Sequence, residues 1–320
     1  MNILQQDAQI VFQPNPLLKV ERAGRTCYQS KQSGSYENAS DFAKRAMQNG
    51  HYSIFEHINF VFVFKKNLGS FYHYLKLLET AQTTPNFSAT VNEKDGRNII
   101  SINFRFLIEA YRCEPLLANL VCLIYDRFPE LFLTPMTAEE CGHDLTDVEC
   151  LTAEEFQMMY ETQLSYAEVL NHLYFSFILQ TDRGVMAEIT RHRLNAFSVS
   201  STRYINFNKK YGGMPVIEPV TGFNDQMIVV LHKIDDTYRD LVNNGMSPQE
   251  ARAILPNCLW TEIFTTANVR QWIHVFELRL SKGAHPQIRA LMEKVRDLIN
   301  LHLVNYNIDL KTMGLVPDAV

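Results

Sequence analysis

The chain has 320 residues, of which 46% are hydrophobic and 20% charged, a globular composition that excludes disordered, collagen-like and low-complexity classes. Its formal net charge of -5, from 30 Lys and Arg against 35 Asp and Glu, argues against a whole-surface nucleic-acid binder. An average of this kind does not exclude a local anion site, because positive charge can gather in one segment.

The first residues lack the basic and apolar regions of a signal peptide, and no apolar run reaches the roughly 18 residues of a membrane span. Six cysteines are scattered along a chain long enough to fold without disulfides. We therefore expect a reduced, cytoplasmic, soluble protein with mostly free thiols and no membrane partner. Cys141, His143 and Cys150 form a partial zinc set, but without a fourth ligand or a CxxC knuckle we expect no metal.

The N-terminal part of the chain predicts a helix followed by a strand. Ser40 supplies an N-cap oxygen, an apolar stripe follows, and Gly50 suits the left-handed position after a helix over 41–49. The next run is rich in β-branched and aromatic residues with partial alternation, which predicts a strand over 57–64.

Turn and composition signals predict the elements that follow. Residues 92–98 form a turn signal, so we expect a hairpin between residues 86–91 and a strand over 99–104. Weaker patterns predict a helix over 70–80, mixed helical structure over 105–130 and an acidic, turn-rich linker over 134–151.

Capping signals organise the C-terminal half. Thr152 and Glu155 form a capping box that opens a helix predicted to run to His172. A second capping box, in the segment 247–250, opens another helix. The remaining expected elements are a strand over 173–178 and two helices over 258–280 and 286–303, broken near Gly283. Together these elements predict an α+β fold in which a mixed or antiparallel sheet is flanked by helices.

Residues 189–217 hold five basic and no acidic side chains, and the segment from Arg191 to Tyr204 also carries several hydroxyls. Arginine offers a planar set of donors that matches phosphate oxygens, which indicates a site for a phosphorylated ligand. A solvated basic surface explains the composition equally well, so composition alone leaves both interpretations open.

The Arg191-His192-Arg193 triplet, separated by seven residues from Ser201, resembles the signature of the flavin-dependent thymidylate synthases. Three other segments resemble motifs of that family in the same order: Arg25 to Tyr28, Gly50 to His57, and Ala251 to Pro256 followed by Asn268, Arg270 and Arg279. The resemblance covers about 15–65 and 173–300. It implies a single domain over 1–320 with an insertion over about 66–172, whose role the sequence does not indicate.

The resemblance implies an enzyme that converts dUMP to dTMP. Methylenetetrahydrofolate would donate the carbon, NADPH the reducing equivalents, and FAD would deliver the hydride, so that no cysteine nucleophile is needed. The protein would then be a FAD-dependent methyltransferase of nucleotide biosynthesis, and the family implies a homotetramer with composite sites. Its partners would be small molecules, dUMP and folate, and not nucleic acid.

The matched positions imply roles for individual side chains. Arg279 is the expected catalytic residue, because in the family its counterpart faces the uracil ring, where a cation favours ionisation at N3. The residues expected to hold dUMP are Glu188, Arg191, Ser201, Arg203, Arg252 and Arg279. The residues expected to hold FAD are His51, Ser53, Glu56, Arg191, His192, Arg193, Asn268, Arg270 and His274. Asn268 and Arg279 are about three turns apart and are expected on one helix face.

Taken singly, these positions also have ordinary structural explanations. His51 after a glycine can be a helix-end histidine, and Glu56 with His57 can be a polar pair at the end of a strand. Arg252 can be an ordinary surface arginine on its helix, and Arg270 and Arg279 can be solvated. The joint match of several motifs is what favours the functional interpretation.

The match also has departures. Val199 and Gly283 stand where many members have a hydrogen-bonding side chain, and Glu188 and His274 replace Gln and Asn. Because an apolar Val199 cannot form the hydrogen bond, the alternative is an FAD- and nucleotide-binding homologue that has lost methyl transfer.

A third, non-enzymatic possibility is a protein-interaction or RNA-binding module in the insertion, which the lack of a basic, aromatic patch there disfavours. Cys258 lacks the following His of the cysteine-dependent synthases, and we expect it to be structural.

Overall fold

The computed structural model describes residues 1–31, 34–64, 87–91, 98–111, 115–134, 136, 147–160, 163–314 and 316. Antiparallel sheets and the helices on their faces dominate this part of the chain, which confirms the α+β prediction. The helix expected over 70–80, the turn at 92–97, Cys141 and His143 lie outside the described residues. Cys27, Cys150 and Cys258 carry free thiols, as expected, whereas Cys122 is disulfide-bonded.

A four-stranded antiparallel sheet positions most of the predicted site residues. Its strands, in spatial order, are β2 (Asp7–Val11), β7 (Tyr174–Asp182), β10 (Trp260–Asn268) and β8 (Ala196–Val199). β10 pairs with β7 along its whole length, from Trp260 opposite Asp182 to Asn268 opposite Tyr174. All residues of β10 except Asn268 are buried, because helices cover both faces of the sheet.

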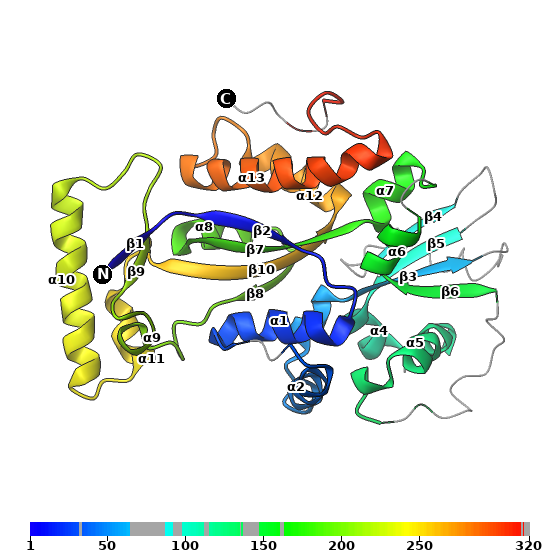
Figure 1. Cartoon of the computed structure of the whole chain (residues 1–320), viewed down its shortest axis with the longest axis horizontal. Helices are drawn as coiled ribbons and strands as arrows, with labels where there is room; N and C mark the ends of the chain where they lie inside the picture. Colours follow the sequence, from blue (N-terminus) through cyan, green and yellow to red (C-terminus); the bar gives the residue numbers. More distant parts are fainter. Residues whose placement is uncertain are drawn as a thin grey trace.

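Helices cover the two faces of this sheet (Figure 1). One face carries α8 (Arg183–Ile189), α12 (Val269–Arg279) and α13 (Pro286–Leu303). The other face carries α1 (Pro16–Tyr28), against which α2 (Tyr36–Gln48) packs. Trp272 of α12 is fully buried, and its indole N–H donates to the backbone oxygen of Phe175 at 3.2 Å. This contact fixes α12 on β7, and with it the position of the arginine that ends the helix.

A second antiparallel sheet extends beyond one end of the first (Figure 1). Its strands, in spatial order, are β4 (Phe87–Val91), β5 (Asn98–Asn103), β3 (Asn59–Phe64) and β6 (Val148–Thr152). The helices around it are η1 (Tyr52–His57), α4 (Phe104–Ala110), α5 (Pro115–Arg127), η2 (Pro129–Leu131), α6 (Ala153–Met159) and α7 (Tyr166–His172). Phe60 and Phe62 of β3 enter the core with α4 and α5, whereas Val61 and Val63 enter the core with α6 and α7. The β4–β5 pairing confirms the predicted hairpin.

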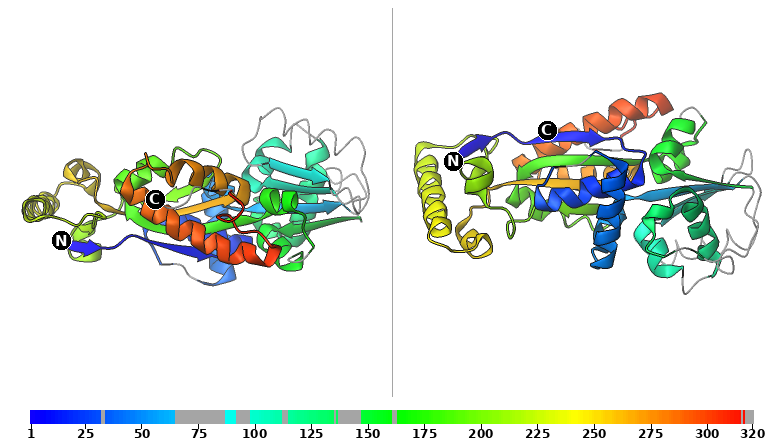
Figure 2. Two further views of the ribbon diagram at one scale, coloured as in Figure 1. Left: turned by 90° about the horizontal axis from the view of Figure 1, so that it is seen from above. Right: turned by 60° about the horizontal axis from the view of Figure 1, so that its bottom comes forward.

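The opposite end of the molecule has a small core of its own (Figure 2). There β1 (Asn2–Leu4) pairs in parallel with β9 (Pro215–Ile217). The other elements at this end are α9 (Phe207–Tyr211), α10 (Asp225–Asn243), α11 (Pro248–Ala251) and η3 (Arg252–Ile254).

At the C-terminal side, η4 (Val304–Tyr306) follows α13. Among the described residues, none of the helices has the length and hydrophobicity that crossing a membrane requires.

Two expectations in the first half of the chain are wrong. The helix predicted over 41–49 begins at Tyr36, because Ser35 rather than Ser40 caps it and accepts the N–H of Asn38 at 3.3 Å. The linker predicted over 134–151 contains most of β6, whose pairing with β3 overrides its acidic, turn-rich composition.

Two expectations in the second half are also wrong. The helix predicted from 152 to 172 is two helices, because a second capping box at Ser165 and Glu168 starts α7. The helix predicted over 258–280 is strand β10 followed by α12. A strand buried on both faces shows no alternation, so its apolar residues can be mistaken for a helical stripe.

Candidate functional site

The basic window runs from the end of α8 through β8 and α9 to β9, and the loop after β8 meets α1 in space. The N–H of Ser201 donates to the backbone oxygen of Cys27 at 2.9 Å. The N–H of Arg203 donates to the Ser201 hydroxyl at 3.2 Å, and the Arg203 guanidinium lies 5.4 Å from the centre of the Tyr204 ring. Tyr204 in turn lies 5.4 Å from the Tyr28 ring. The Arg25–Tyr28 motif and the basic window are therefore neighbours in space.

A buried histidine links a third motif to these elements. The two ring nitrogens of His57 lie 3.0 Å from the Thr266 hydroxyl on β10 and 3.1 Å from the Ser198 hydroxyl on β8. Complete burial, reinforced by the charge of Lys19, holds the pKa of His57 well below its ordinary value. The neutral ring can donate from one nitrogen and accept at the other. One side chain thus fixes η1 against two strands of the central sheet.

A pocket of about 380 Å³ opens between α1, α2 and η1. It is lined by Gly24, Cys27, Tyr28, Phe42, Ala46, Gly50, His51, Tyr52, Ser53, Ile54 and Arg105. His51 and Ser53, both expected to hold FAD, are exposed here, while Glu56 is half-buried and forms an ion pair with Arg105. Apolar and aromatic walls with a few polar groups are typical of a small-molecule site.

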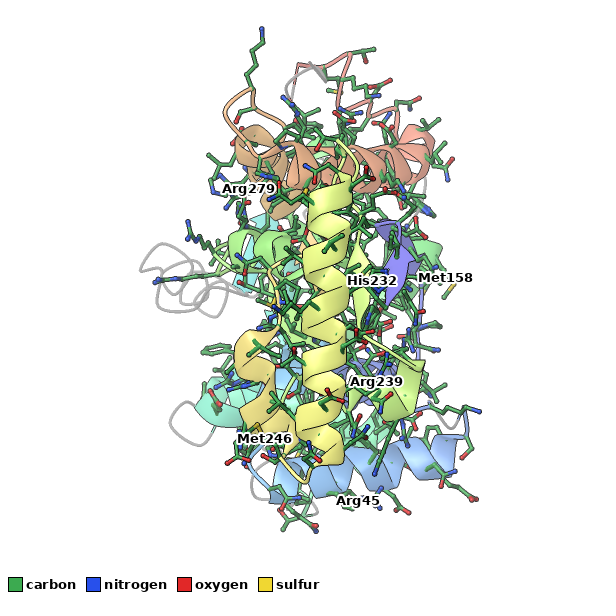
Figure 3. The ribbon with its side chains drawn as sticks, turned by 90° about the vertical axis from the view of Figure 1, so that its left-hand side faces the viewer. Arg45, Met158, His232, Arg239, Met246 and Arg279 are labelled. Atoms are coloured by element: carbon green, nitrogen blue, oxygen red, sulfur yellow. The ribbon has the colours of Figure 1, made fainter. Side chains whose placement is uncertain are left out.

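The expected catalytic residue, Arg279, ends α12 beside α8 and is labelled in Figure 3. One of its terminal amines donates to the backbone oxygen of Glu188 at 2.7 Å, and the other contacts the Glu188 carboxylate at 3.3 Å. Its Nε donates to Nε2 of His192 at 3.0 Å. Arg279 therefore makes three polar contacts, and 17% of its side chain remains exposed to solvent.

Burial and the contact with Arg279 together keep His192 unprotonated. Because Nε2 accepts a hydrogen bond, it cannot itself carry a proton. Burial, followed by the charges of Arg279 and His274, lowers the pKa of His192 to about 4. The ring of His274 lies 5.9 Å from that of His192 and is exposed beside Glu277. His192 is therefore neutral at physiological pH.

The start of α12 holds two more residues expected to bind FAD. The Asn268 side chain caps the helix by accepting the N–H of Gln271 at 2.9 Å, and its amide donates to the backbone oxygen of Asn171 at 3.2 Å. The Nε of Arg270 donates to the Asn171 side chain at 2.7 Å. Asn268 and Arg279 thus lie at opposite ends of α12. Asn171, inside the predicted insertion, has no signal in the sequence that would have identified it.

Arg252, expected to hold dUMP, starts η3 and faces a second arginine. Its guanidinium donates to the Thr202 hydroxyl at 3.3 Å. Burial and the charge of Arg252 lower the pKa of Arg183 below its ordinary value. Arg183 is half-buried and has no carboxylate partner among the described residues, so it adds positive charge that the sequence motifs did not identify.

Five of the six arginines expected at the site have no counter-charge among the described residues, and Arg279 is the exception. Within the described residues no carboxylate pairs with Arg191, Arg193, Arg203, Arg252 or Arg270, all of them exposed. The arginines that do pair with a carboxylate include Arg22, Arg25, Arg105, Arg127, Arg239, Arg279 and Arg296. Arg279, Glu188 and His192 form what we call the Arg279 cluster. Among the described residues, no hydrogen bond or ion pair joins this cluster to His51, Ser53 or Glu56.

The remaining predictions concern Val199, Cys258 and metal. Val199 is half-buried on β8 opposite Ile263, with an apolar side chain where the family motif often has a polar one. Burial raises the pKa of the Cys258 thiol to about 11, so it is a weak nucleophile at neutral pH. Among the described residues no three His, Cys, Asp or Glu side chains are grouped to bind a metal ion.

The family model described as thymidylate synthase complementing protein matches residues 9–78 and 143–302. The unmatched residues 79–142 lie within the insertion predicted over about 66–172. The chain is 33% identical over 142 residues to a flavin-dependent thymidylate synthase of Geobacter sulfurreducens, covering 42% of this chain and 60% of that protein. For the enzyme of the same name from Pyrococcus furiosus the identity is 27% over 136 residues, covering 41% of this chain and 56% of that protein. The matches thus span less than two thirds of these relatives.

One solved structure is similar over 99% of both chains, at 13% identity and a TM-score of 0.42. It is the crystal structure of a UMP/dUMP methylase PolB from Streptomyces cacaoi bound with 5-Br dUMP. A similarity of this degree carries no conclusion about the site.

Proposed function

Because this chain belongs to the thymidylate synthase complementing protein family, we propose that it is a flavin-dependent thymidylate synthase. The proposed reaction converts dUMP to dTMP, with methylenetetrahydrofolate as carbon donor and NADPH as reductant through FAD. Two kinds of observation support it: the matched motifs meet around β8, β10 and η1, and the curated relatives carry this name.

The observation that carries the proposal is the group of arginines without counter-charges. A nucleotide phosphate is nearly a dianion at neutral pH, and each charge-assisted hydrogen bond to it contributes roughly 1.5–3 kcal/mol. Arginines already paired with carboxylates could not offer that gain in full. Arg203 and Arg252 are exposed and have no carboxylate partner among the described residues, which suits them to bind the phosphate of dUMP.

Arg279 is the proposed catalytic residue, with Glu188, Arg191 and Ser201 as further contacts to dUMP. A neutral His192 accepts from its Nε, so the guanidinium is oriented without a second positive charge beside it. Only part of Arg279 is exposed, and its charge is therefore less screened than that of a free arginine. Next to the uracil ring such a cation would stabilise negative charge that develops at N3.

The residues present fit a flavin. The pocket beside η1 has aromatic and apolar walls and exposes His51 and Ser53, while Arg191, Arg193 and Arg270 offer donors for two phosphates. We propose that these residues, with Glu56, His192, Asn268 and His274, hold FAD. When bound, FAD would supply the hydride that reduces the transferred carbon. These residues would bind and orient FAD, and the buried contact with Arg279 keeps His192 unprotonated.

We further propose a cytoplasmic homotetramer with composite sites. Within one chain no hydrogen bond or ion pair among the described residues joins the Arg279 cluster to His51, Ser53 or Glu56, which supports a site completed by a neighbouring subunit. Measurement of the molar mass in solution by light scattering tests the assembly, and a monomer that turns over dUMP would contradict it.

The second candidate is a homologue that binds FAD and nucleotide but has lost methyl transfer. Val199 favours it, because an apolar side chain on β8 removes a hydrogen bond that the family motif often provides. Release of tritium from 5-tritiated dUMP, in the presence of folate donor and NADPH, separates the two candidates. Binding of FAD and dUMP without release supports the second, and a protein that binds no added FAD refutes both.

A single variant tests the assignment of the phosphate site. Arg203→Ala should weaken dUMP binding by about tenfold or more, because a charge-assisted contact to phosphate is lost. FAD binding, measured by quenching of flavin fluorescence, should change much less. Equal weakening of both ligands would show that the role given to Arg203 is wrong.

A further inference from the structure

The internal segment that the family model leaves unmatched, residues 79–142, contacts η1, which carries predicted flavin residues. The contact is made by residues 103–105, at the junction of β5 and α4, which we call the 103–105 corner. This corner lies within the unmatched residues 79–142, whereas η1 lies within the matched residues 9–78.

The corner first holds the backbone of η1. The side-chain amide of Asn103 donates to the backbone oxygen of Glu56 at 2.5 Å, while its oxygen accepts the N–H of Phe106 at 3.3 Å and caps α4. The N–H of Phe104 donates to the backbone oxygen of Ile58 at 3.0 Å. Backbone groups on both sides of His57 are therefore fixed by the corner.

Packing gives the corner a rigid base. The Phe104 side chain is fully buried and lies 6.0 Å from the ring of Phe55 and 5.8 Å from the ring of Phe60. Aromatic contacts of this kind add to the free energy gained from burial alone. The corner can therefore not shift relative to η1 without disrupting the core.

The corner also holds the side chain of Glu56. A terminal amine of Arg105 donates to the Glu56 carboxylate, and its Nε donates to the Glu109 carboxylate at 2.9 Å. Arg105 lines the same pocket as His51 and Ser53. Because two carboxylates already surround its charge, Arg105 is poorly suited to bind an anionic ligand itself. It is placed instead to fix the orientation of Glu56.

We propose that Arg105, which lines the pocket, is a positioning residue for the flavin site, through which the inserted segment orients Glu56 beside the pocket. This inference rests on the proposed function, since it is FAD that Glu56 is expected to contact. It gives the inserted segment a role in cofactor binding that the family motifs do not include.

The test compares two arginines in similar environments. Arg105→Gln should weaken FAD binding by about fivefold, the upper end for a partly exposed ion pair. Arg127→Gln is the matched control, because Arg127 pairs with Glu155 at 2.7 Å with the same exposed fraction, 36%, and lines no part of the pocket. Arg105→Lys, which keeps the charge near Glu56, should restore part of the affinity.

The measurements are FAD affinity by fluorescence quenching and the thermal unfolding midpoint for each full-length variant. The inference is supported if both Gln variants lose similar stability but only Arg105→Gln loses affinity, with partial rescue by Lys. Equal FAD affinity of wild type and Arg105→Gln, or equal losses in both Gln variants, would refute it. If Arg105→Gln does not fold, full wild-type affinity in Arg105→Lys and in Glu56→Gln refutes it, and weaker binding in both supports it. A wild-type chain that binds no FAD would instead refute the proposed function, and the role of Arg105 with it.

Discussion

The hydrogen bond from Arg279 to His192 predicts how the stability of the protein depends on pH. Replacing His192 by Gln keeps a neutral acceptor near the position of Nε2 but removes the group that titrates. Burial and the neighbouring Arg279 lower the pKa of His192 to about 4, whereas in the unfolded chain the ring returns to 6.5. The wild type and the variant should therefore respond differently to acid.

The sign and the size follow from proton binding. Between pH 6.5 and about 4 the unfolded state binds a proton that native His192 does not, so the stability of the wild type falls as the pH falls. The loss reaches about 3 kcal/mol below pH 4, at 1.36 kcal/mol per pKa unit, and about 2 kcal/mol at pH 5. Above pH 6.5 the ring is neutral in both states and contributes no pH dependence.

Urea unfolding at pH 7.5 and pH 5 measures this loss. The wild type should lose about 2 kcal/mol more than His192→Gln between the two conditions. His57 is buried and titrates in the same sense, but it is present in both proteins and cancels in the comparison. His232, exposed on α10 and labelled in Figure 3, supplies a control: His232→Gln should follow the wild type. Parallel losses in wild type and His192→Gln would refute the assignment of a neutral, buried acceptor.

Two further predictions concern packing near the site. In the wild type, Nζ of Lys19 lies 2.5 Å from the carboxylate of Glu154, and both side chains are buried. Lys19→Met should lower the free energy of unfolding by about 3–5 kcal/mol, because it leaves the Glu154 carboxylate buried without a counter-charge. Adding Glu154→Leu should restore most of this loss in urea unfolding, and no recovery would contradict the explanation. Gly24→Ala should cost about 1–3 kcal/mol, because the added Cβ would meet the Phe42 ring at 2.5 Å. Gly283→Ala has nothing within 4 Å of its Cβ and should leave the thermal midpoint unchanged, so equal effects of the two changes would contradict the packing argument.

The capping boxes in the sequence predicted correctly where two helices begin, although the single cap expected at Ser40 was wrong. The capping boxes at Thr152 and in the segment 247–250 open helices as expected, because capping depends on residues only three positions apart. β10 was predicted as helix, because its pattern reflects burial between two layers of helices rather than its own propensity. Whether a segment is covered on both faces is decided by residues far away in the chain.

In the candidate site, too, features set by nearby residues could be predicted from the sequence, and features set by distant residues could not. The arginines of the basic window could be identified from their spacing, because the motif is contiguous in the sequence. Asn171 and Arg105 could not, since each contacts its partners across dozens of residues and carries no motif of its own. The absence of carboxylates near Arg203 and Arg252, among the described residues, likewise depends on folding.

The arginines without counter-charges have a kinetic consequence. The chain carries a net charge of -5, so an approaching anion is repelled by the molecule as a whole and attracted to the segments that carry these arginines. Such a field raises the rate of productive encounter more than it slows dissociation, and it acts over roughly 8 Å at physiological ionic strength. The rate at which a phosphorylated ligand arrives should therefore fall steeply with added salt, while its residence time, set by direct contacts, changes less.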